Sequence, residues 1–243
     1  MTAKSSYELV IVMPIYNEEE SIGTVLQTWF EELDHLQINA IVYAINDGSG
    51  DGTGAVLRDF ETRQPTRLVL FDKPNSGHGR TCRFGYDRAC QTNVEWVLQI
   101  DSDGQCDPVY FKSFWTRREE ADCLIGLRTT RGDSRARRFV SIVCTALTSL
   151  VTGQTLLDPN VPYRLIRRSV LSQALRLVPP DFDVHNVALL LALKRNKRNR
   201  FCRIPIHFPP RQAGHSSIDF PKIIRMGPRM LLELSKVGHP QDL

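Results

Sequence analysis

The chain has 243 residues, of which 42% are hydrophobic and 24% are charged, and its formal net charge is +4. This length fits one large α/β domain or two small ones, and the composition excludes a disordered chain, a collagen-like repeat and a coiled coil. The charge is unevenly distributed, because residues 1–127 carry 11 basic and 20 acidic side chains, whereas residues 128–243 carry 20 basic and 7 acidic ones. Arg supplies 24 of the 31 basic residues, and Arg is suited to forked contacts with phosphate and carboxylate groups.

The first 127 residues alternate between strand-like and helix-like runs. Glu8–Met13 is a β-branched apolar run that predicts a buried strand ended by Pro14, and Glu18–Leu33 has helical apolar spacing with Asn17 as its expected N-cap. Further strands are predicted at Ile38–Ile45, Arg67–Phe71, Glu95–Ile100 and Cys123–Leu127, and further helices at Asp51–Phe60, His78–Cys90 and Pro108–Glu120. The alternation predicts an α/β fold with a mostly parallel sheet and helices on both faces.

The remainder of the chain is predicted to be mainly helical and basic. Helices are expected at Phe139–Val151, Arg168–Leu177, Val184–Lys194 and Ile218–Val237, with an edge strand at Phe201–Ile206. No linker separates the two halves, so we expect one domain over residues 1–243.

Several features of the sequence exclude other classes of protein. No apolar stretch reaches the roughly 20 residues that a membrane-spanning helix needs, and the N-terminus lacks a signal-peptide pattern. The six cysteines form no CxxC pair, so we expect free thiols and a cytoplasmic location. No nucleic-acid-binding motif accompanies the basic residues, and nucleic acid is not an expected partner.

Polar side chains follow the predicted strands, where open α/β sheets bind their ligands. Asp101, Asp103 and Gln105 come directly after the apolar run VLQI. Two carboxylates and an amide oxygen form a hard, all-oxygen set that suits Mg²⁺ or Mn²⁺ carried with a diphosphate. An Asx-turn without a metal is the structural alternative. Because no GxGxxG follows Met13, a dinucleotide-binding unit is not expected.

Four segments at these strand ends resemble one known family. PIYNEEESI, NDGSGDGT, NSGHGRTCRFG and IDSDGQCDP are similar in order and spacing to the motifs of family 2 glycosyltransferases of the GT-A fold. The resemblance covers roughly residues 8–217 and favours the polyprenyl-phosphate glycosyltransferase branch, of which dolichyl-phosphate mannose synthase is the type. It implies a nucleotide-sugar-binding half over residues 1–127, an acceptor half over residues 128–217 and an amphipathic C-terminal helix over residues 218–243.

The resemblance also implies roles for individual residues. The nucleotide-binding residues would be Pro14, Tyr16, Glu18, Asn46, Asp47, His78, Gly79, Asp101 and Ser102. The metal ligands would be Asp101, Asp103 and Gln105. Residues acting on the diphosphate or the acceptor would be Asp103, Arg128, Arg138, Ser141 and Arg211. Of these, Arg138 and Ser141 match positions that hold an acceptor phosphate, and Arg211 opens a segment that closes over the diphosphate.

The chain departs from the family pattern at four positions. Asn46 replaces the first Asp of Asp-Asp-Gly-Ser, His78 replaces a Lys between glycines, Pro162 replaces a Gly, and Ser217 replaces a Lys. These changes indicate a divergent subgroup and leave the nucleobase of the donor open.

Three functions follow from these residues. The first is metal-dependent, inverting transfer of a sugar from a GDP- or UDP-sugar to a polyprenyl (dolichyl or undecaprenyl) phosphate, which needs no general base because the phosphate is already largely a dianion. The second is transfer to a hydroxyl acceptor, which needs a carboxylate base, and Asp158, Asp181 or Asp183 is the candidate. The third is a non-catalytic nucleotide-sugar-binding protein.

A lipid acceptor would require contact with a membrane. The apolar Phe139–Val151 segment and the basic, amphipathic Ile218–Val237 helix are the expected sites of peripheral contact with the cytoplasmic face of a membrane, or with a membrane-protein partner. Packing of both helices into the protein core is the alternative.

Overall fold

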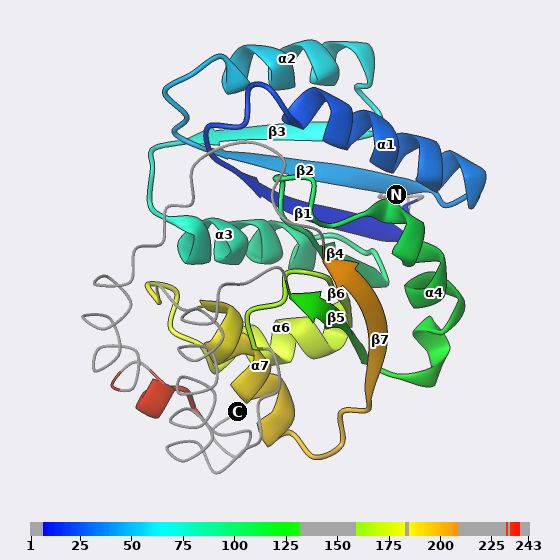
Figure 1. The fold of residues 1–243 in the computed structure, drawn as a ribbon. Coiled ribbons are helices and arrows are strands. Elements are labelled where there is room, and N and C mark those ends of the chain that lie inside the picture. Colours follow the sequence, from blue (N-terminus) through cyan, green and yellow to red (C-terminus); the bar gives the residue numbers. More distant parts are fainter. Residues whose placement is uncertain (1–6, 132–158, 183–184, 209–231, 233, 239–243) are drawn as a thin grey trace, which may run out of the picture.

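The computed structural model describes residues 7–131, 159–182, 185–208, 232 and 234–238. Its centre is a seven-stranded sheet in the order β3-β2-β1-β4-β6-β5-β7 (Figure 1). The strands are β1 (Leu9–Ile15), β2 (Ala40–Asp47), β3 (Leu68–Lys73), β4 (Trp96–Gln99), β5 (Cys123–Arg131), β6 (Arg164–Arg167) and β7 (Phe201–Phe208). All pairings are parallel except those of β6, which runs antiparallel to both β4 and β5. The predicted α/β fold with a mostly parallel sheet is confirmed.

Helices cover both faces of the sheet. They are α1 (Ile22–His35), α2 (Thr53–Arg63), α3 (His78–Cys90), α4 (Phe111–Thr116), α6 (Arg168–Arg176) and α7 (His185–Arg195). Figure 1 shows α1 and α2 on one side of β1 and β2, and α3, α6 and α7 on the other. On the α1 side the Trp29 ring lies 5.6 Å from the Phe111 ring and 6.0 Å from the Tyr163 ring, measured between centroids. The core is therefore built from aromatic and aliphatic side chains of both chain halves.

Pro14 does not end the first strand, as its sequence position predicted. β1 continues to Ile15, and Pro14 pairs with Ile45 of β2. On its other side, β1 pairs with β4 only as far as Val12, whose carbonyl accepts a hydrogen bond from the Ile100 amide. Backbone polar groups alternate sides along a strand, so Pro14 faces the side where the β4 ladder has already finished. The missing N–H of Pro14 therefore costs no ladder hydrogen bond.

The first helix begins later than predicted, and Asn17 is not its N-cap. The helix starts at Ile22 after Ser21, and Asn17 adopts a left-handed backbone conformation with a φ of 53°. The Asn17 side-chain oxygen accepts a hydrogen bond from the Gly50 amide at 2.8 Å. The prediction was wrong because this capping-type side chain bonds to the neighbouring loop and not to the helix.

One further prediction was wrong in detail, and one strand was not predicted. The single helix expected over Pro108–Glu120 is divided into a 3-10 turn (Pro108–Tyr110), α4, and a second 3-10 turn (Arg118–Glu120). The strand β6 was not predicted, because it has only four residues and begins and ends with Arg. Its Arg164 is 1% exposed and donates hydrogen bonds to three backbone carbonyls, so its charge is satisfied inside the protein.

The second half of the chain is described in part. The predicted elements at α6, α7 and β7 are present, and β7 is an edge strand. The predicted Phe139–Val151 helix lies outside the described residues, as does most of Ile218–Val237, so the basic helical lobe stays a prediction. Within the described ranges, no helix is long and apolar enough to cross a membrane. The five described cysteines are free, as expected.

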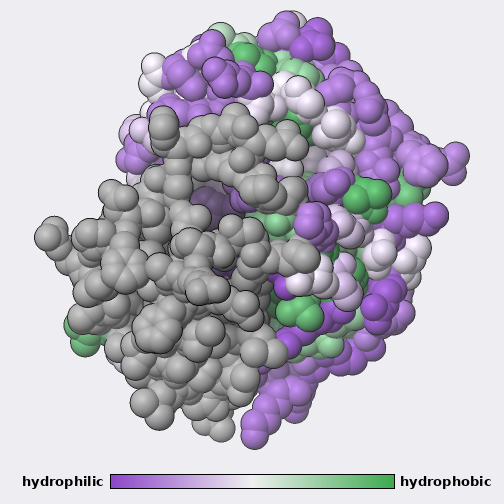
Figure 2. All heavy atoms as spheres, in the orientation of Figure 1, coloured by the Kyte–Doolittle hydropathy of each residue, from purple (hydrophilic) through white to green (hydrophobic). Residues whose placement is uncertain are grey.

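The described surface is mainly hydrophilic on the face shown in Figure 2, with apolar residues scattered among polar ones. The exposed large hydrophobic side chains in the described ranges are Tyr16, Val109 and Leu232. Tyr16 directly follows the carboxyl end of β1, and its side chain is 50% exposed.

Gly85 sets how closely α3 approaches the sheet. A Cβ added at this residue would lie 2.4 Å from Val12 Cγ1 and 2.8 Å from Ile45 Cδ1, so we expect Gly85→Ala to destabilise the protein by about 1–3 kcal/mol through overpacking. Urea unfolding followed by circular dichroism measures this. The control is Gly50→Ala, because no atom lies within 4 Å of a Cβ at Gly50. Equal stability of the two variants would contradict the close approach of α3.

Candidate functional site

The carboxyl ends of the parallel strands bring the four predicted motifs to one edge of the sheet. Ile15 of β1 pairs with Asn46 of β2, which pairs in turn with Asp72 of β3. On the other side, β4 ends at Gln99 opposite Val12, and the loop with Asp101, Ser102, Asp103 and Gln105 follows. Parallel pairing thus places Pro14, Tyr16, Asn46, Asp47 and Asp101 near one another, as the resemblance implied.

The loops after β1 and β2 are joined by hydrogen bonds. The Asn17 amide donates to Ser49 Oγ at 3.0 Å, the Glu18 amide donates to Thr53 Oγ1 at 2.8 Å, and the Gly52 amide donates to Glu19 Oε2 at 2.8 Å. Glu18, predicted to line a nucleotide, is only 7% exposed, and its Oε2 accepts a hydrogen bond from Ser21 Oγ at 2.7 Å. These bonds hold the edge of the site in one conformation.

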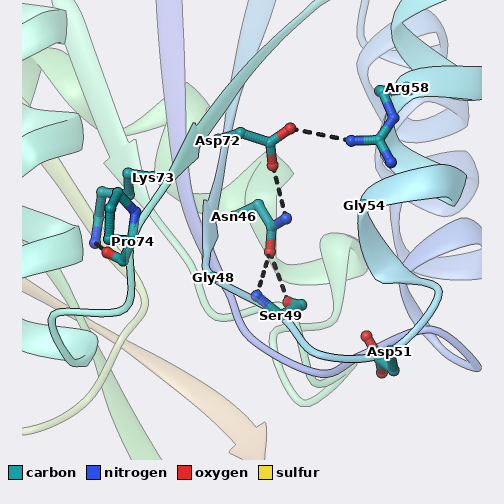
Figure 3. A pocket seen from close by; sticks show the side chains of 9 residues that line it. All are labelled: Asn46, Gly48, Ser49, Asp51, Gly54, Arg58, Asp72, Lys73 and Pro74. Atoms are coloured by element: carbon teal, nitrogen blue, oxygen red, sulfur yellow. Dashed lines mark hydrogen bonds and ion pairs between the residues drawn. The ribbon is translucent and has the colours of Figure 1, made fainter.

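A hollow of about 390 Å³ lies at the ends of β2 and β3 (Figure 3). The Asn46 amide nitrogen donates to Asp72 Oδ1 at 2.7 Å, and Asn46 Oδ1 accepts from Ser49 Oγ at 2.6 Å. Arg58 of α2 reaches Asp72 Oδ2 at 3.2 Å. Asn46 therefore donates to a neighbouring carboxylate, which an Asp at this position would repel. This pairing is a physical reason for the departure from the usual Asp-Asp-Gly-Ser pattern.

Asp47 faces the opposite side of the sheet from Asn46, because adjacent side chains of a strand alternate. It is 3% exposed, forms an ion pair with Lys73, and accepts hydrogen bonds from the Ser76 and Gly77 amides at 2.9 Å each. Burial alone would raise the pKa of Asp47. The hydrogen bonds from Lys73 and Ser76 outweigh this effect, so the pKa of Asp47 lies below its usual value. Asp47 thus fastens the loop that leads into α3.

The loop after β4 has the donor set that was predicted for a metal. Asp101 Oδ1 accepts a hydrogen bond from Gln99 Nε2 at 3.1 Å. Asp103 Oδ1 accepts a hydrogen bond from the backbone N–H of Gln105 at 3.1 Å. The second bond is the Asx-turn considered as an alternative, and it shapes the loop without excluding a metal. Asp101, Asp103 and Gln105 are partly exposed and present only oxygen ligands, which fit a hard divalent cation.

No group of three His, Cys, Asp or Glu side chains that could hold a metal is found among the described residues. A metal at this loop would therefore depend on two carboxylates, the Gln105 amide oxygen and oxygens from a ligand, which is typical of Mg²⁺ bound together with a phosphate.

His78 is the first residue of α3, and its side chain is about half exposed. Its Nε2 lies 3.7 Å from Asp101 Oδ1 and 3.5 Å from Cys82 Sγ. Cys82 and the carboxylates of Asp101 and Asp103 raise the pKa of His78 above its usual value. His78 is thus placed beside the predicted metal loop, whereas Gly79 is buried within α3.

Arg128 lies near the same loop. Its guanidinium is 5.4 Å from the centre of the Phe208 ring. Burial raises the pKa of the Cys106 thiol well above its usual value. The negative charge of Asp101 raises this pKa further, and the positive charge of Arg128 lowers it.

The other predicted acceptor-side or base residues lie outside the described residues. They are Arg138, Ser141, Asp158, Asp183 and Arg211. Asp181 is exposed, and its carbonyl accepts a hydrogen bond from Arg80.

Some residues at the site were missed by sequence reasoning. Asp72 and Lys73 end β3, and the strand-end rule applied to the other strands would have selected them. Gln99 lies inside an apolar run, and the sequence predicts it only as part of a buried strand. His185 is the first residue of α7, and no motif around it in the sequence indicates a role at the site. Only the packing of α7 against α3 brings its ring close to Tyr86.

His185 is a buried histidine with unusual surroundings. It is 1% exposed, its ring centroid lies 5.7 Å from that of Tyr86, and neither ring nitrogen has a hydrogen-bond partner among the described residues. Burial lowers its pKa to about 3, with contributions from Arg83, Arg164 and His78. The buried imidazole of His185 is thus neutral, and its two unpaired nitrogens lower the stability of the folded protein.

Comparison with known proteins identifies similar chains. A family model described as "Glycosyl transferase family 2" matches residues 10–175. An undecaprenyl-phosphate 4-deoxy-4-formamido-L-arabinose transferase of Edwardsiella ictaluri is 24% identical over 219 residues, covering 89% of this chain and 64% of that protein. The corresponding protein of Proteus mirabilis is 23% identical with the same coverage. The chain therefore spans less than two thirds of the length of these relatives.

Solved structures share the fold. Glucosyl-3-phosphoglycerate synthase from Mycobacterium tuberculosis, in complex with Mn²⁺, uridine diphosphate and phosphoglyceric acid, has a TM-score of 0.67 at 18% identity, covering 97% of this chain and 80% of that one. Mannosyl-3-phosphoglycerate synthase from Rubrobacter xylanophilus has a TM-score of 0.66 at 15% identity, covering 95% and 73%. These similarities extend across most of the chain.

The neutral His185 predicts a specific pH dependence of stability. Its pKa of about 3 is below the unfolded value of about 6.5, so acid protonates the unfolded chain first and stability falls as the pH drops below 6.5. Between pH 7.5 and pH 5 this loss amounts to about 2 kcal/mol. We expect His185→Leu to reduce the loss by that amount in urea unfolding. The same pH dependence in His185→Leu and the wild-type chain would contradict a buried neutral imidazole.

Proposed function

This chain belongs to glycosyl transferase family 2, and we propose that it transfers a sugar, with inversion, from a nucleotide diphosphate sugar to a polyprenyl phosphate. The observation that carries the proposal is the convergence of four strand-end motifs beside the all-oxygen Asp101, Asp103 and Gln105 set. The curated relatives, which are named as undecaprenyl-phosphate sugar transferases, support a lipid-phosphate acceptor.

The donor nucleotide would bind along the edge formed by β1, β2 and β3. Tyr16 is 50% exposed there and offers an aromatic face, and the hollow beside Asn46 offers amide and carboxylate groups. Asp72 is paired with both Asn46 and Arg58, which fixes the polar groups before a ligand arrives. Preorganised polar groups reduce the cost of ordering a site when the ligand binds.

Mg²⁺ or Mn²⁺ would be held by Asp101, Asp103 and Gln105. When bound, the metal supplies positive charge that stabilises the departing diphosphate. His78, half exposed and 3.7 Å from Asp101, lies on the same side and would donate a hydrogen bond to the diphosphate. Arg211 would add a forked contact to the diphosphate, on the basis of its sequence motif.

The acceptor phosphate would be held by Arg128, with Arg138 and Ser141 in the roles implied by the sequence. An acceptor phosphate oxygen forms a bond to the anomeric carbon while the bond from that carbon to the donor diphosphate breaks. No proton has to be removed, because the phosphate is largely a dianion at neutral pH. Arginines that hold and orient the acceptor therefore do the work that a general base does for a hydroxyl.

A hydroxyl acceptor is the second candidate. The glucosyl-3-phosphoglycerate synthase of similar fold was solved with Mn²⁺, UDP-glucose and phosphoglyceric acid, a molecule that carries both a hydroxyl and a phosphate. Such a reaction requires a base, for which Asp158, Asp181 and Asp183 are the candidates. Asp181 is exposed on the surface, which gives a base no shelter from water.

The lipid acceptor implies a place for the protein at a membrane. We expect a cytoplasmic chain that makes peripheral contact with the cytoplasmic face through Ile218–Val237, or that binds a membrane-protein partner.

Binding of the donor should depend on the metal loop. We expect UDP or GDP to raise the melting temperature only with Mn²⁺ or Mg²⁺ present, and Asp103→Ala to weaken that nucleotide binding at least tenfold in calorimetry, because the diphosphate charge loses its counter-charge. Asp107→Asn is the control, since Asp107 is an exposed carboxylate that only caps the following turn. Metal-independent binding, or equal binding by Asp103→Ala, would refute the proposed donor site.

Acceptor variants separate the two candidate reactions. With undecaprenyl phosphate and a radiolabelled nucleotide sugar, we expect Arg128→Ala and Arg138→Ala each to reduce kcat/KM about 100-fold or more through loss of charge-assisted contacts. Asp158→Asn and Asp183→Asn should retain turnover, and Arg117→Ala, at an exposed ion pair with Glu120, serves as the control. Turnover that is lost in Asp158→Asn or Asp183→Asn, and retained in the Arg variants, would favour a hydroxyl acceptor.

A further inference from the structure

Gln99 is a polar side chain inside the core. It is the last residue of β4, and it is 0% exposed although its three companions in the strand are Trp96, Val97 and Leu98. A buried amide destabilises the protein unless its donors and acceptors are paired. An apolar side chain at this position would need no hydrogen-bond partners, so the groups that pair with the Gln99 amide indicate what it does.

The two ends of the Gln99 amide are hydrogen-bonded to different groups. Its Nε2 donates to Asp101 Oδ1 at 3.1 Å, and its Oε1 accepts from the Tyr86 hydroxyl at 3.4 Å. Tyr86 is 0% exposed and belongs to α3, which packs on this face of the sheet. The three side chains form a hydrogen-bonded relay from α3 to the loop of the proposed donor site, in which Tyr86 and Gln99 are buried and Asp101 is partly exposed.

This arrangement fixes which way the amide points. A flipped amide would place Oε1 against the Asp101 carboxylate, and two acceptors at that distance repel. The Tyr86 hydroxyl donates a hydrogen bond, so it favours the amide orientation in which Oε1 of Gln99 faces Tyr86. In that orientation the NH₂ group of Gln99 faces Asp101. The pKa of Tyr86 is raised by burial, which keeps the hydroxyl protonated and able to donate.

Arg164 anchors the same region from the other side. It pairs directly with Gln99 across the antiparallel β4–β6 ladder, so the two side chains project from the same face of the sheet. Its guanidinium donates to the carbonyls of Val161 at 2.7 Å and Asn186 at 2.8 Å, and also bonds to Pro159. Gln99 thus lies between two fixed, buried residues and has little freedom to turn.

The hydrogen bond from Gln99 restrains only one oxygen of Asp101. Both the Gln99 bond and the approach of His78 are at Oδ1, and no group among the described residues hydrogen-bonds to Oδ2. An Asp side chain on a loop otherwise rotates, which reduces the affinity of any cation it binds. Restraint of Oδ1 therefore orients Oδ2 before a ligand is present.

We propose that Gln99, held in one orientation by Tyr86, is a positioning residue that presets the Asp101 carboxylate for the divalent cation of the donor site. This inference rests on the proposed function. Neither Gln99 nor Tyr86 touches the substrate in this role, and both act through Asp101. The relay also gives a reason for the presence of a buried amide and a buried phenol on facing elements of a largely apolar core.

The test compares metal affinity with stability. Mn²⁺ is titrated, with UDP or GDP present, into the wild-type chain, Gln99→Met and Tyr86→Phe, and free Mn²⁺ is read by electron paramagnetic resonance. Methionine keeps the length of the side chain but cannot donate, so we expect about tenfold weaker Mn²⁺ binding in Gln99→Met. A smaller loss, about threefold, is expected in Tyr86→Phe, where the amide is free to flip. In turnover assays, raised Mn²⁺ should restore the kcat of both variants.

A control separates positioning from a general loss of packing. Val97→Ala removes buried methyl groups from the same strand, so it should lower the melting temperature and leave Mn²⁺ affinity unchanged. Unchanged Mn²⁺ affinity in Gln99→Met, or an equal loss in Val97→Ala, would overturn the inference. Absence of Mn²⁺ binding in the wild-type chain, or binding that survives Asp103→Ala, would instead overturn the proposed function, so the two failures are distinguishable.

Discussion

The parallel pairing of β2, β1 and β4 is the constraint on which the whole site depends. Because these strands run in one direction, their carboxyl ends meet at one edge, and each of the following loops is delivered there. The register is equally important. Asn46 lies beside both Ile15 and Asp72, and Gln99 lies opposite Val12, so polar groups from distant parts of the sequence become neighbours. No single segment contains this site.

The alternation of side chains along a strand then divides neighbouring residues between two tasks. Asn46 faces the α2 side and contributes to the hollow with Asp72 and Arg58, whereas Asp47 faces the α3 side and fastens the Ser76–Gly77 turn. The same rule places Gln99 and Arg164 together on the α3 face. Two adjacent residues of one strand thus have different surroundings: Asn46 lines the hollow, and Asp47 holds the loop that leads into α3.

The uneven charge of the chain agrees with this arrangement. The acidic first half supplies the carboxylates at the strand ends, and the Arg-rich second half supplies Arg128 on β5 and the buried Arg164 on β6. These two arginines already show different uses of one residue type, since Arg164 holds backbone carbonyls within the core and Arg128 is partly exposed. Under the proposed reaction, the first group of charges serves the donor and Arg128 serves the acceptor.

The sequence by itself determined the α/β class and the family, and it located the strand-end segments that meet at one edge of the sheet, because hydrophobic period and strand-end motifs are local features of the sequence. It also located α3 to the residue. It failed where tertiary contacts decide: Asn17 bonds to a neighbouring loop and not to its helix, and Arg164 is buried in a strand because distant carbonyls receive its charge. Only the tertiary structure joined Tyr86, Gln99 and Asp101, since a hydrogen-bonded relay depends on which faces of α3 and β4 meet.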